Sequence, residues 1–188
     1  MDNRTTLLNV ALDLFADRGY DAVGVQEIVT AASVTKPTLY HYFGSKTALL
    51  EKLVAEQSAP LVTELAAATS YAGDLPLTLS RIVRAYFDFA RARPTFYRLH
   101  LALWFAPPHS EARQIVVDFH ESLYRMIEDV FAQAAADHGN MRGRQRAYAA
   151  TLIGMINTYI GLHLQGYLDL DQQIAQQAVH QFSHGIYS

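Results

Sequence analysis

The amino-acid sequence predicts an all-α protein, and two observations carry this prediction. Apolar residues recur at helical spacing along nearly the whole chain, and no convincing alternation of period two occurs. Segments rich in glycine, proline and other turn-forming residues separate the helical stretches, at residues 18–24, 72–76, 106–110 and 138–143. With 188 residues, of which 51% are hydrophobic, the chain is long enough to bury the core of one globular domain or of two small ones.

The helices are expected to be short at first and long afterwards. The first fifty residues have room for three or four short helices, with apolar stripes at Leu8, Leu12 and Phe15, at Val25, Ile28 and Val29, and at Leu49, Leu50 and Leu53. A connecting helix is expected from Ser45 to about Thr69, and longer helices at about 75–93, 95–105, 110–137, 143–168 and 171–186. We therefore predict a small head of residues 1–50, with a helix-turn-helix of three helices, and a larger helical body of residues 51–188.

The segment SVTKPTLYHYFGSK, residues 33–46, carries the helix-turn-helix prediction. Thr35 is a good N-cap, and Pro37 suits the first helical turn because its missing N–H has no partner there. Leu39 and Phe43 lie four residues apart and share an inward face. The outward face then carries Lys36, Thr38, Tyr40 and His41, with Tyr42 at its edge. Two short helices, a tight turn and an outer face of donors and aromatic rings are typical of a helix-turn-helix.

The acidic and basic residues of the head are unevenly distributed along its sequence, although the whole chain has a net charge of −3. Residues 1–52 contain five basic and six acidic residues. Three of the five basic residues lie at or beyond the expected recognition helix, and five of the six acidic residues lie before it. Ser45 is expected to cap the connecting helix, with Lys46 at its start, which makes a suitable place for a phosphate. This distribution favours binding to nucleic acid.

Residues Ala11 to Leu50 resemble the tetracycline-repressor (TetR) family of bacterial transcription regulators, most specifically in LYHYF-x-SK-x-x-L, residues 39–49. The resemblance implies a DNA-binding head on a helical body that binds a ligand and forms a dimer. By position, it implies that the recognition helix presents Thr35, Lys36, Pro37, Thr38, Tyr40 and His41. It also implies phosphate contacts by Tyr42 and Lys46, and a further backbone contact near Gly24 and Val25.

Two positions depart from the family's pattern. The family usually has threonine or serine as the cap of the second helix, where this chain has Gly24, so this contact is expected to be weaker or to use the backbone alone. The turn of the motif usually carries glycine, and here it carries Ser33, which adopts a left-handed conformation only with strain.

The segment 147–168 contains no charged residue and is long enough to cross a bilayer, yet it carries Thr151, Asn157, Thr158, His163 and Gln165, which are costly in hydrocarbon. We therefore expect a helix buried in protein and no membrane partner. One stripe, expected to face the body's own core, comprises Leu152, Ile156, Ile160, Leu164 and Leu168. A second face comprises Ala150, Gly154, Asn157, Thr158, Gly161 and Gln165. A stripe of the last helix comprises Ile174, Ala178, Phe182 and Ile186.

Glycine within a helix costs about 1 kcal/mol relative to alanine, so two glycines on one face indicate the close approach of another helix. We predict that the last two helices pair with those of a second copy in a four-helix interface, as the resemblance also implies. The alternative is that both faces are buried within one chain.

The middle of the body is rich in aromatic residues that are candidates for an effector pocket: Tyr86, Phe89, Phe96, His100, Trp104, Phe119, His120 and Tyr124. Such a pocket suits a small, largely apolar or aromatic effector, and the alternative is a closed aromatic core. The arginines between Arg81 and Arg98 suit either a solvated face with ion pairs or recognition of an acidic ligand.

Composition also excludes several classes. The chain has no cysteine, so disulfides, thiolate metal sites and cysteine nucleophiles are excluded, which fits a cytoplasmic protein. The N-terminal segment is amphipathic and carries Asp13 and Asp17, so no signal peptide is expected. No HExxH motif occurs, so we expect no enzyme, cofactor or metal site. Two alternatives stay open. One is a metal-sensing regulator using His100 and His120, and the other is an interaction module that has lost DNA binding, for which Gly24, Ser33 and the acidic first helix argue.

Overall fold

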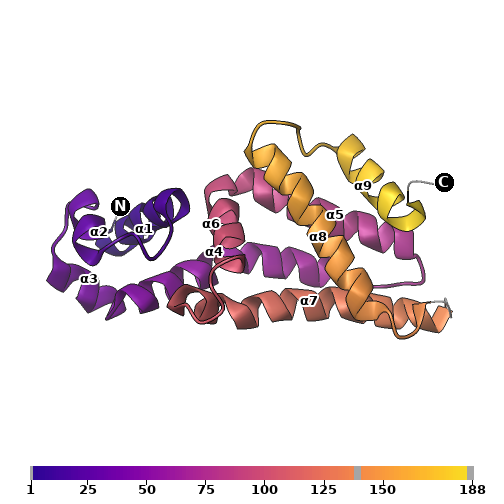
Figure 1. Cartoon of the computed structure of the whole chain (residues 1–188), viewed down its shortest axis with the longest axis horizontal. Coiled ribbons are helices and arrows are strands. Elements are labelled where there is room, and N and C mark those ends of the chain that lie inside the picture. Colours follow the sequence, from indigo (N-terminus) through magenta and orange to yellow (C-terminus); the bar gives the residue numbers. More distant parts are fainter. Residues whose placement is uncertain (1, 138–140, 186–188) are drawn as a thin grey trace. The chain divides into compact units, whose positions relative to one another are not determined.

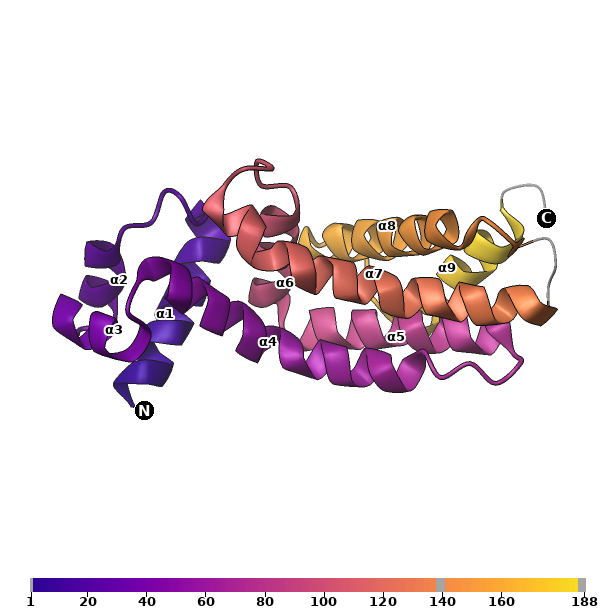
Figure 2. The same cartoon turned by 90° about the horizontal axis from the view of Figure 1, so that it is seen from below.

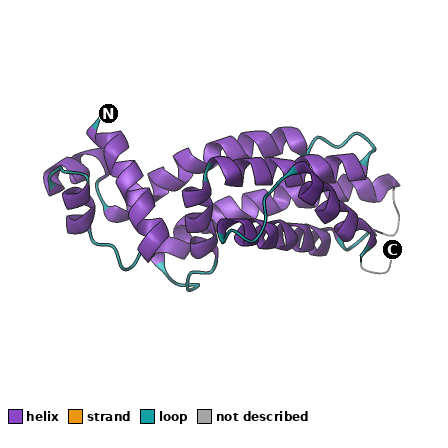
Figure 3. Ribbon diagram, turned by 90° about the horizontal axis from the view of Figure 1, so that it is seen from above, coloured by secondary structure: helices purple, strands orange, loops and turns teal. Residues whose placement is uncertain are grey.

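The computed structural model describes residues 2–137 and 141–185, and within these ranges it forms nine α-helices and no strand (Figures 1 and 3). They are α1 (Asn3–Arg18), α2 (Val25–Ala31), α3 (Lys36–Phe43), α4 (Lys46–Ala68), α5 (Leu75–Ala92), α6 (Pro94–Trp104), α7 (Glu111–Asp137), α8 (Gln145–Leu164) and α9 (Gln172–His184). The predicted all-α class, with a helix-turn-helix head and a helical body, is confirmed.

The chain divides into two compact units. The first contains the residues up to 59 together with residues 94–119, and the second contains residues 60–93 and those from 120 onward. The first unit therefore adds α6 and the start of α7 to the segment that the sequence predicts as the head. Both α4 and α7 begin in the first unit and continue into the second.

The first unit is built around the apolar faces of short helices. α1 is capped by Asp2, whose carboxylate accepts a hydrogen bond from the backbone N–H of Thr5 at 2.7 Å, and it packs against α6. The side chains that fill this core are fully or almost fully buried: Leu7, Leu8, Ala11, Phe15, Ile28, Val29, Leu39 and Phe43. The inward stripes predicted for the head are thus present, with Leu12 only half-buried.

The turn between α2 and α3 contains Ser33, at a φ of 54°. This is the left-handed conformation expected at this position, and Ser33 is the one residue other than glycine with positive φ among the described residues. The N–H of Val34 donates to the carbonyl of Val29 at 2.9 Å, which closes the end of α2. The turn therefore keeps the geometry that glycine usually supplies, in spite of the side chain.

The second unit is a bundle in which α5 packs against both α8 and α9. In the view of Figure 2, α7 runs between α5 and α8. α5 contributes the buried residues Ile82, Val83, Tyr86 and Phe87, whereas α9 contributes Ala175 and Ala178. From α8, Leu152, Ile156 and Ile160 are buried as predicted.

The predicted end of the 143–168 helix is wrong. α8 ends at Leu164, because Gly166 adopts a φ of +79° and the N–H of Tyr167 turns back to the carbonyl of Leu162 at 3.0 Å. Leu168 thus lies outside the helix and does not extend its stripe. The predicted contribution of Ile186 falls outside the described residues. Across the ranges that the structure describes, no helix is long and apolar enough to cross a membrane.

Candidate nucleic-acid interface

The helix α3 buries two residues and exposes the rest. Leu39 and Phe43 face inward, at 0% and 9% exposed. Tyr40 and Tyr42 are 47% and 41% exposed, although large aromatic side chains are usually buried more deeply. Lys36, Pro37 and His41 are also exposed, and Thr38 is half-buried. α3 therefore presents a surface of rings, hydroxyls and an ammonium that is largely exposed among the described residues.

Hydrogen bonds at the start of α3 hold this surface in place. The Thr35 side chain accepts from the backbone N–H of Thr38 at 3.4 Å, and the two threonine hydroxyls lie 2.9 Å apart. The ring of His41 meets the ring of Tyr42 edge to face, with centroids 5.3 Å apart. At the next helix, the Ser45 hydroxyl accepts from the N–H of Ala48 at 3.0 Å, as its predicted role as a cap requires.

Gly24 is the N-cap of α2 and supplies no side-chain hydrogen bond. It is exposed and has an ordinary negative φ of −92°, and a Cβ added there would meet no atom within 4 Å. Nothing in the fold thus requires glycine at this cap, and any contact here uses the backbone. Val25, the first residue of α2, is half-buried.

Lys46 is half-buried and contacts the loop between α1 and α2. Its ammonium donates to the backbone carbonyls of Tyr20 and Val23, at 3.0 Å each, and lies 3.9 Å from the centroid of the Tyr20 ring. The resemblance implied a phosphate contact for Lys46. In this structure two of its three donors are engaged by the loop between α1 and α2.

Comparison with known families identifies these features. The family model described as "Bacterial regulatory proteins, tetR family" matches residues 7–53, which contain α2, α3 and the start of α4. The model described as BetI-type transcriptional repressor, C-terminal, matches residues 78–187, more than half of the chain. The chain belongs to the tetR family. It is therefore a transcriptional regulator of the helix-turn-helix class, as the sequence predicts.

Individual relatives of this chain are also helix-turn-helix transcription regulators. The chain is 29% identical over 184 residues to the HTH-type transcriptional activator FasR of Mycolicibacterium smegmatis, covering 98% of this chain and 82% of that protein. It is 41% identical over 51 residues to the HTH-type transcriptional repressor KstR2 of Rhodococcus jostii, which is 27% of this chain and 25% of the relative.

Solved structures share the fold. A putative fatty acid metabolism regulator of Clostridium perfringens has a TM-score of 0.81 at 17% identity, over 97% of this chain and 99% of that one. The regulator FadR of Bacillus subtilis, in complex with stearoyl-CoA, has a TM-score of 0.79 at 16% identity over the same shares. At these identities the likeness shows the fold alone.

Several residues that the sequence predicts for a dimer interface are exposed in the single tetR-family chain. Ala150, Gly154, Thr158 and Gln165 are exposed, and Asn157, Gly161, Ile174 and Phe182 are half-buried. Ala178 is fully buried in its own chain. A Cβ built on Gly154 or Gly161 would meet nothing within 4 Å. Packing within the described part of one chain thus gives no reason for either glycine.

The aromatic residues predicted for the effector are distributed over both units. In the first, His100 is buried, with ring centroids 5.2 Å from Tyr97 and 5.8 Å from Phe119, beside Phe96. Trp104 is half-buried, with the Arg113 guanidinium 5.2 Å from its ring. These contacts are those of a packed aromatic cluster.

In the second unit, Tyr86, Phe89 and His120 are buried and Tyr124 is half-buried. The Tyr86 hydroxyl is buried and has no hydrogen-bond partner among the described residues, and burial raises its pKa well above the usual value.

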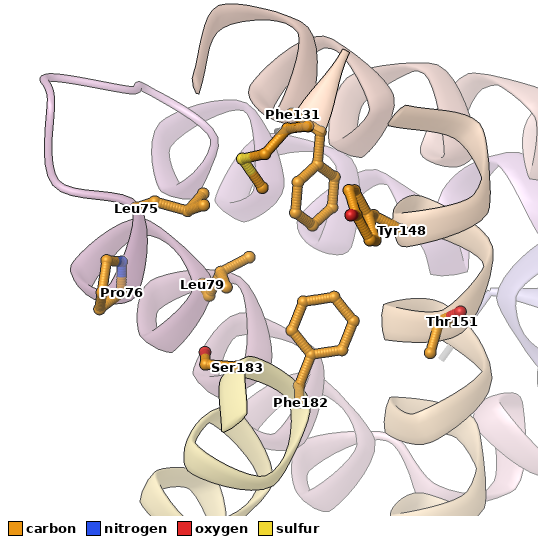
Figure 4. A pocket seen from close by; sticks show the side chains of 9 residues that line it. Leu75, Pro76, Leu79, Phe131, Tyr148, Thr151, Phe182 and Ser183 are labelled. Atoms are coloured by element: carbon orange, nitrogen blue, oxygen red, sulfur yellow. The ribbon is translucent and has the colours of Figure 1, made fainter. Parts of the chain in front are cut away.

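Sequence reasoning did not find a cavity of about 510 Å³ in the second unit. It is lined by Leu75, Pro76, Leu79, Phe131, Met141, Tyr148, Thr151, Phe182 and Ser183. Figure 4 shows the rings of Phe131, Tyr148 and Phe182 around it. Four different helices and a loop supply these residues, so no local pattern marks them. The volume and apolar lining suit a small organic molecule.

The histidines do not assemble a metal centre in the part of the chain that is described. No group of three or more potential ligands occurs there. His100 and His120 belong to different units. His180 and His184 are exposed and stack on each other, with ring centroids 4.6 Å apart, a spacing expected of neighbours on one helical face.

Two arginines of the stretch between Arg81 and Arg98 donate hydrogen bonds to backbone carbonyls. Arg91 donates to the carbonyl of Leu170 at 3.1 Å, and Arg81 donates to that of Ser70 at 2.8 Å.

Proposed function

We propose that this tetR-family chain is a repressor that binds a pseudo-palindromic operator as a homodimer and is released by a small, largely apolar or aromatic effector. The observation that carries the DNA-binding part is the outer face of α3. Exposed aromatic rings and a lysine on a helix whose other face is anchored by Leu39 and Phe43 suit insertion into a major groove, which admits one α-helix.

Each exposed group has a chemical role in this proposal. Lys36 donates to guanine O6 or N7, and Pro37 or Thr38 meets the methyl group of a thymine. Tyr40 and His41 contact bases or phosphates, whereas Tyr42 donates to a phosphate. Thr35 and the backbone at Gly24 and Val25 complete the contacts. One short helix makes too few contacts for a unique site, so two heads on a symmetric operator are needed.

The open glycine face of α8 supports the homodimer, because it allows a second helix to approach closely. The effector proposal is supported by the unpartnered Tyr86 hydroxyl and by the apolar cavity beside Tyr148. A regulator with the same fold binds stearoyl-CoA, whose acyl chain is apolar. By linkage, the effector releases DNA if it binds more tightly to a state in which the two heads no longer match the half-sites.

The experiment is binding of the purified chain to the intergenic DNA upstream of its own gene, with Tyr42→Ala and Lys36→Ala as test variants. Tyr167→Ala is the matched control, because this tyrosine is 73% exposed and lies outside the head. We expect both test variants to lose roughly tenfold in affinity and the control to lose none. Failure of the wild type to bind this fragment and every sequence recovered by random-site selection would contradict DNA binding and favour a protein partner.

Effector binding is tested on the same DNA fragment. Acyl-CoA thioesters and uncharged aromatic compounds are added in turn, and the effective compound is retested on Tyr86→Phe and Tyr148→Phe. A selective loss in one variant places the effector near that hydroxyl. If no compound of either class changes DNA affinity in the wild type, the effector class proposed here is wrong.

A further inference from the structure

A hydrogen-bonded cluster in the first unit joins the loop between α1 and α2 to the starts of α4 and α7. Lys46 and Thr47 come from α4, Tyr20 from the loop, and Glu111 from the first turn of α7. Lys46 donates to two carbonyls of the loop, as described above. The Tyr20 hydroxyl donates to one carboxylate oxygen of Glu111, and the Thr47 hydroxyl donates to the other, at 2.5 Å each. Four residues from three segments are thus linked.

Tyr20 is the centre of this cluster. It is 4% exposed, and its ring packs against Phe15 at 5.2 Å on one side and against the Lys46 ammonium on another. Its backbone carbonyl and its hydroxyl are both bonded, to Lys46 and Glu111 respectively. A displacement of Tyr20 would therefore break its contacts with Lys46 and Glu111.

Glu111 is held as a carboxylate. Hydrogen bonds from Thr47 and Tyr20, together with the charge of Lys46, lower the pKa of Glu111 below its usual value. Its place in the first turn of α7 is also favourable for a negative charge. Because both oxygens accept from residues of the head, the start of α7 is attached to the loop and to α4.

The Lys46 ammonium belongs to the same cluster. An ammonium has three donors, and two of them are engaged by the carbonyls of Tyr20 and Val23. Two of the three donors, together with the contact to the Tyr20 ring, thus hold the ammonium at the loop. The loop that these bonds hold leads directly into α2, against which α3 packs.

We propose that Lys46 and Glu111 are positioning residues for DNA recognition: they fix the loop of residues 19–24 and thereby the orientation of α2 and α3, and Lys46 does not bind phosphate. This inference rests on the proposed DNA binding. It also gives α7 a role, because this helix continues from Glu111 into the second unit and attaches the head to the body by a second route besides α4.

The salt dependence of DNA binding tests the role of Lys46. A residue that neutralises one phosphate contributes about 0.9 to the slope of log K against log salt concentration. We expect Lys46→Met to lower affinity roughly tenfold with an unchanged slope. A slope reduced by about 0.9 in Lys46→Met overturns the proposal.

Amide hydrogen exchange without DNA tests the cluster independently of DNA binding. We expect Glu111→Gln to accelerate exchange in residues 19–25 about tenfold relative to α5, because a hydrogen-bonded carboxylate is lost. Thr47→Val removes one donor while keeping the shape, and we expect a smaller increase in exchange for it. This variant replaces Glu111→Gln if the glutamine variant fails to fold. Glu64→Gln, an exposed carboxylate on α4 in the second unit, is the control. Unchanged exchange in Thr47→Val and Glu111→Gln overturns the proposal even if the wild type binds DNA.

Discussion

The buried histidine of α6 makes stability depend on pH in a way that can be calculated. His100 is 7% exposed and lies among the rings of Phe96, Tyr97 and Phe119. Burial disfavours the charged imidazolium and lowers the pKa of His100 from 6.5 to about 4. The histidine is therefore neutral in the folded chain at neutral pH and remains neutral well below it.

The sign and the size follow from linkage. Between pH 6.5 and pH 4 the unfolded chain binds a proton at this histidine and the folded chain does not. The free energy of unfolding is thus unaffected by His100 above pH 6.5 and falls as the pH decreases through this interval. With these two pKa values, the loss between pH 7 and pH 5 is about 2 kcal/mol.

Urea unfolding at pH 7 and pH 5, at one protein concentration and ionic strength, measures this loss. We expect the wild type to lose about 2 kcal/mol more than His100→Gln between the two values, because the carboxylates titrate alike in both. His109→Gln, which removes an exposed histidine, should behave as the wild type. His100→Phe serves if the glutamine variant does not fold. Equal losses in the wild type and the His100 variant would refute a buried, neutral histidine.

Four further substitutions follow from the structure. Ser33→Gly removes the strain of the left-handed conformation and should raise the free energy of unfolding by up to about 1 kcal/mol, with DNA affinity unchanged. This corresponds to a melting temperature higher by about 2–4 °C. A lower melting temperature would show that Ser33 is not strained. Tyr86→Phe removes an unpartnered buried hydroxyl and should raise the free energy of unfolding by about 1 kcal/mol; a loss of that size would show that the hydroxyl is satisfied. Gly24→Ser should stabilise the chain by about 0.5 kcal/mol through a new cap, seen as a higher urea midpoint, and tighten DNA binding; weaker binding would mean that the side chain obstructs the contact. Gly154→Leu should convert dimer to monomer in sedimentation while helicity by circular dichroism is retained; a dimer of unchanged affinity would place the interface elsewhere.

The helices of the head were predictable because local signals agree with tertiary packing. Thr35, Pro37 and Ser45 mark the starts of α3 and α4 by capping chemistry that does not depend on distant residues, and each has the expected place. The strain at Ser33 could be anticipated as well, because the turn needs a left-handed residue whatever its side chain. The end of α8 was missed, since Gly166 acts as a C-terminal cap within a segment that otherwise continues the apolar pattern.

The long-range parts of the site could not be predicted. Glu111 meets Tyr20 and Thr47 across separations of 91 and 64 residues, and nothing in the residues around it marks a carboxylate with two hydroxyl partners. The direction of Lys46 is decided by two backbone carbonyls, which every sequence has. The cavity beside Tyr148 likewise arises from residues far apart in the sequence.

The open glycines of α8 bear on how much of this protein a cell must contain. Gly154 and Gly161 together weaken their helix by about 2 kcal/mol relative to alanine, although a Cβ at either position would meet no atom of the described chain within 4 Å. In the proposed homodimer the same two positions allow close contact, so the stability of the body rises with protein concentration. Scarce chains would be the first to unfold and be degraded, and abundant chains would persist. Such a regulator would occupy its operator only above a threshold of its own abundance. Repression would then rise more steeply with protein concentration than if each head bound DNA alone.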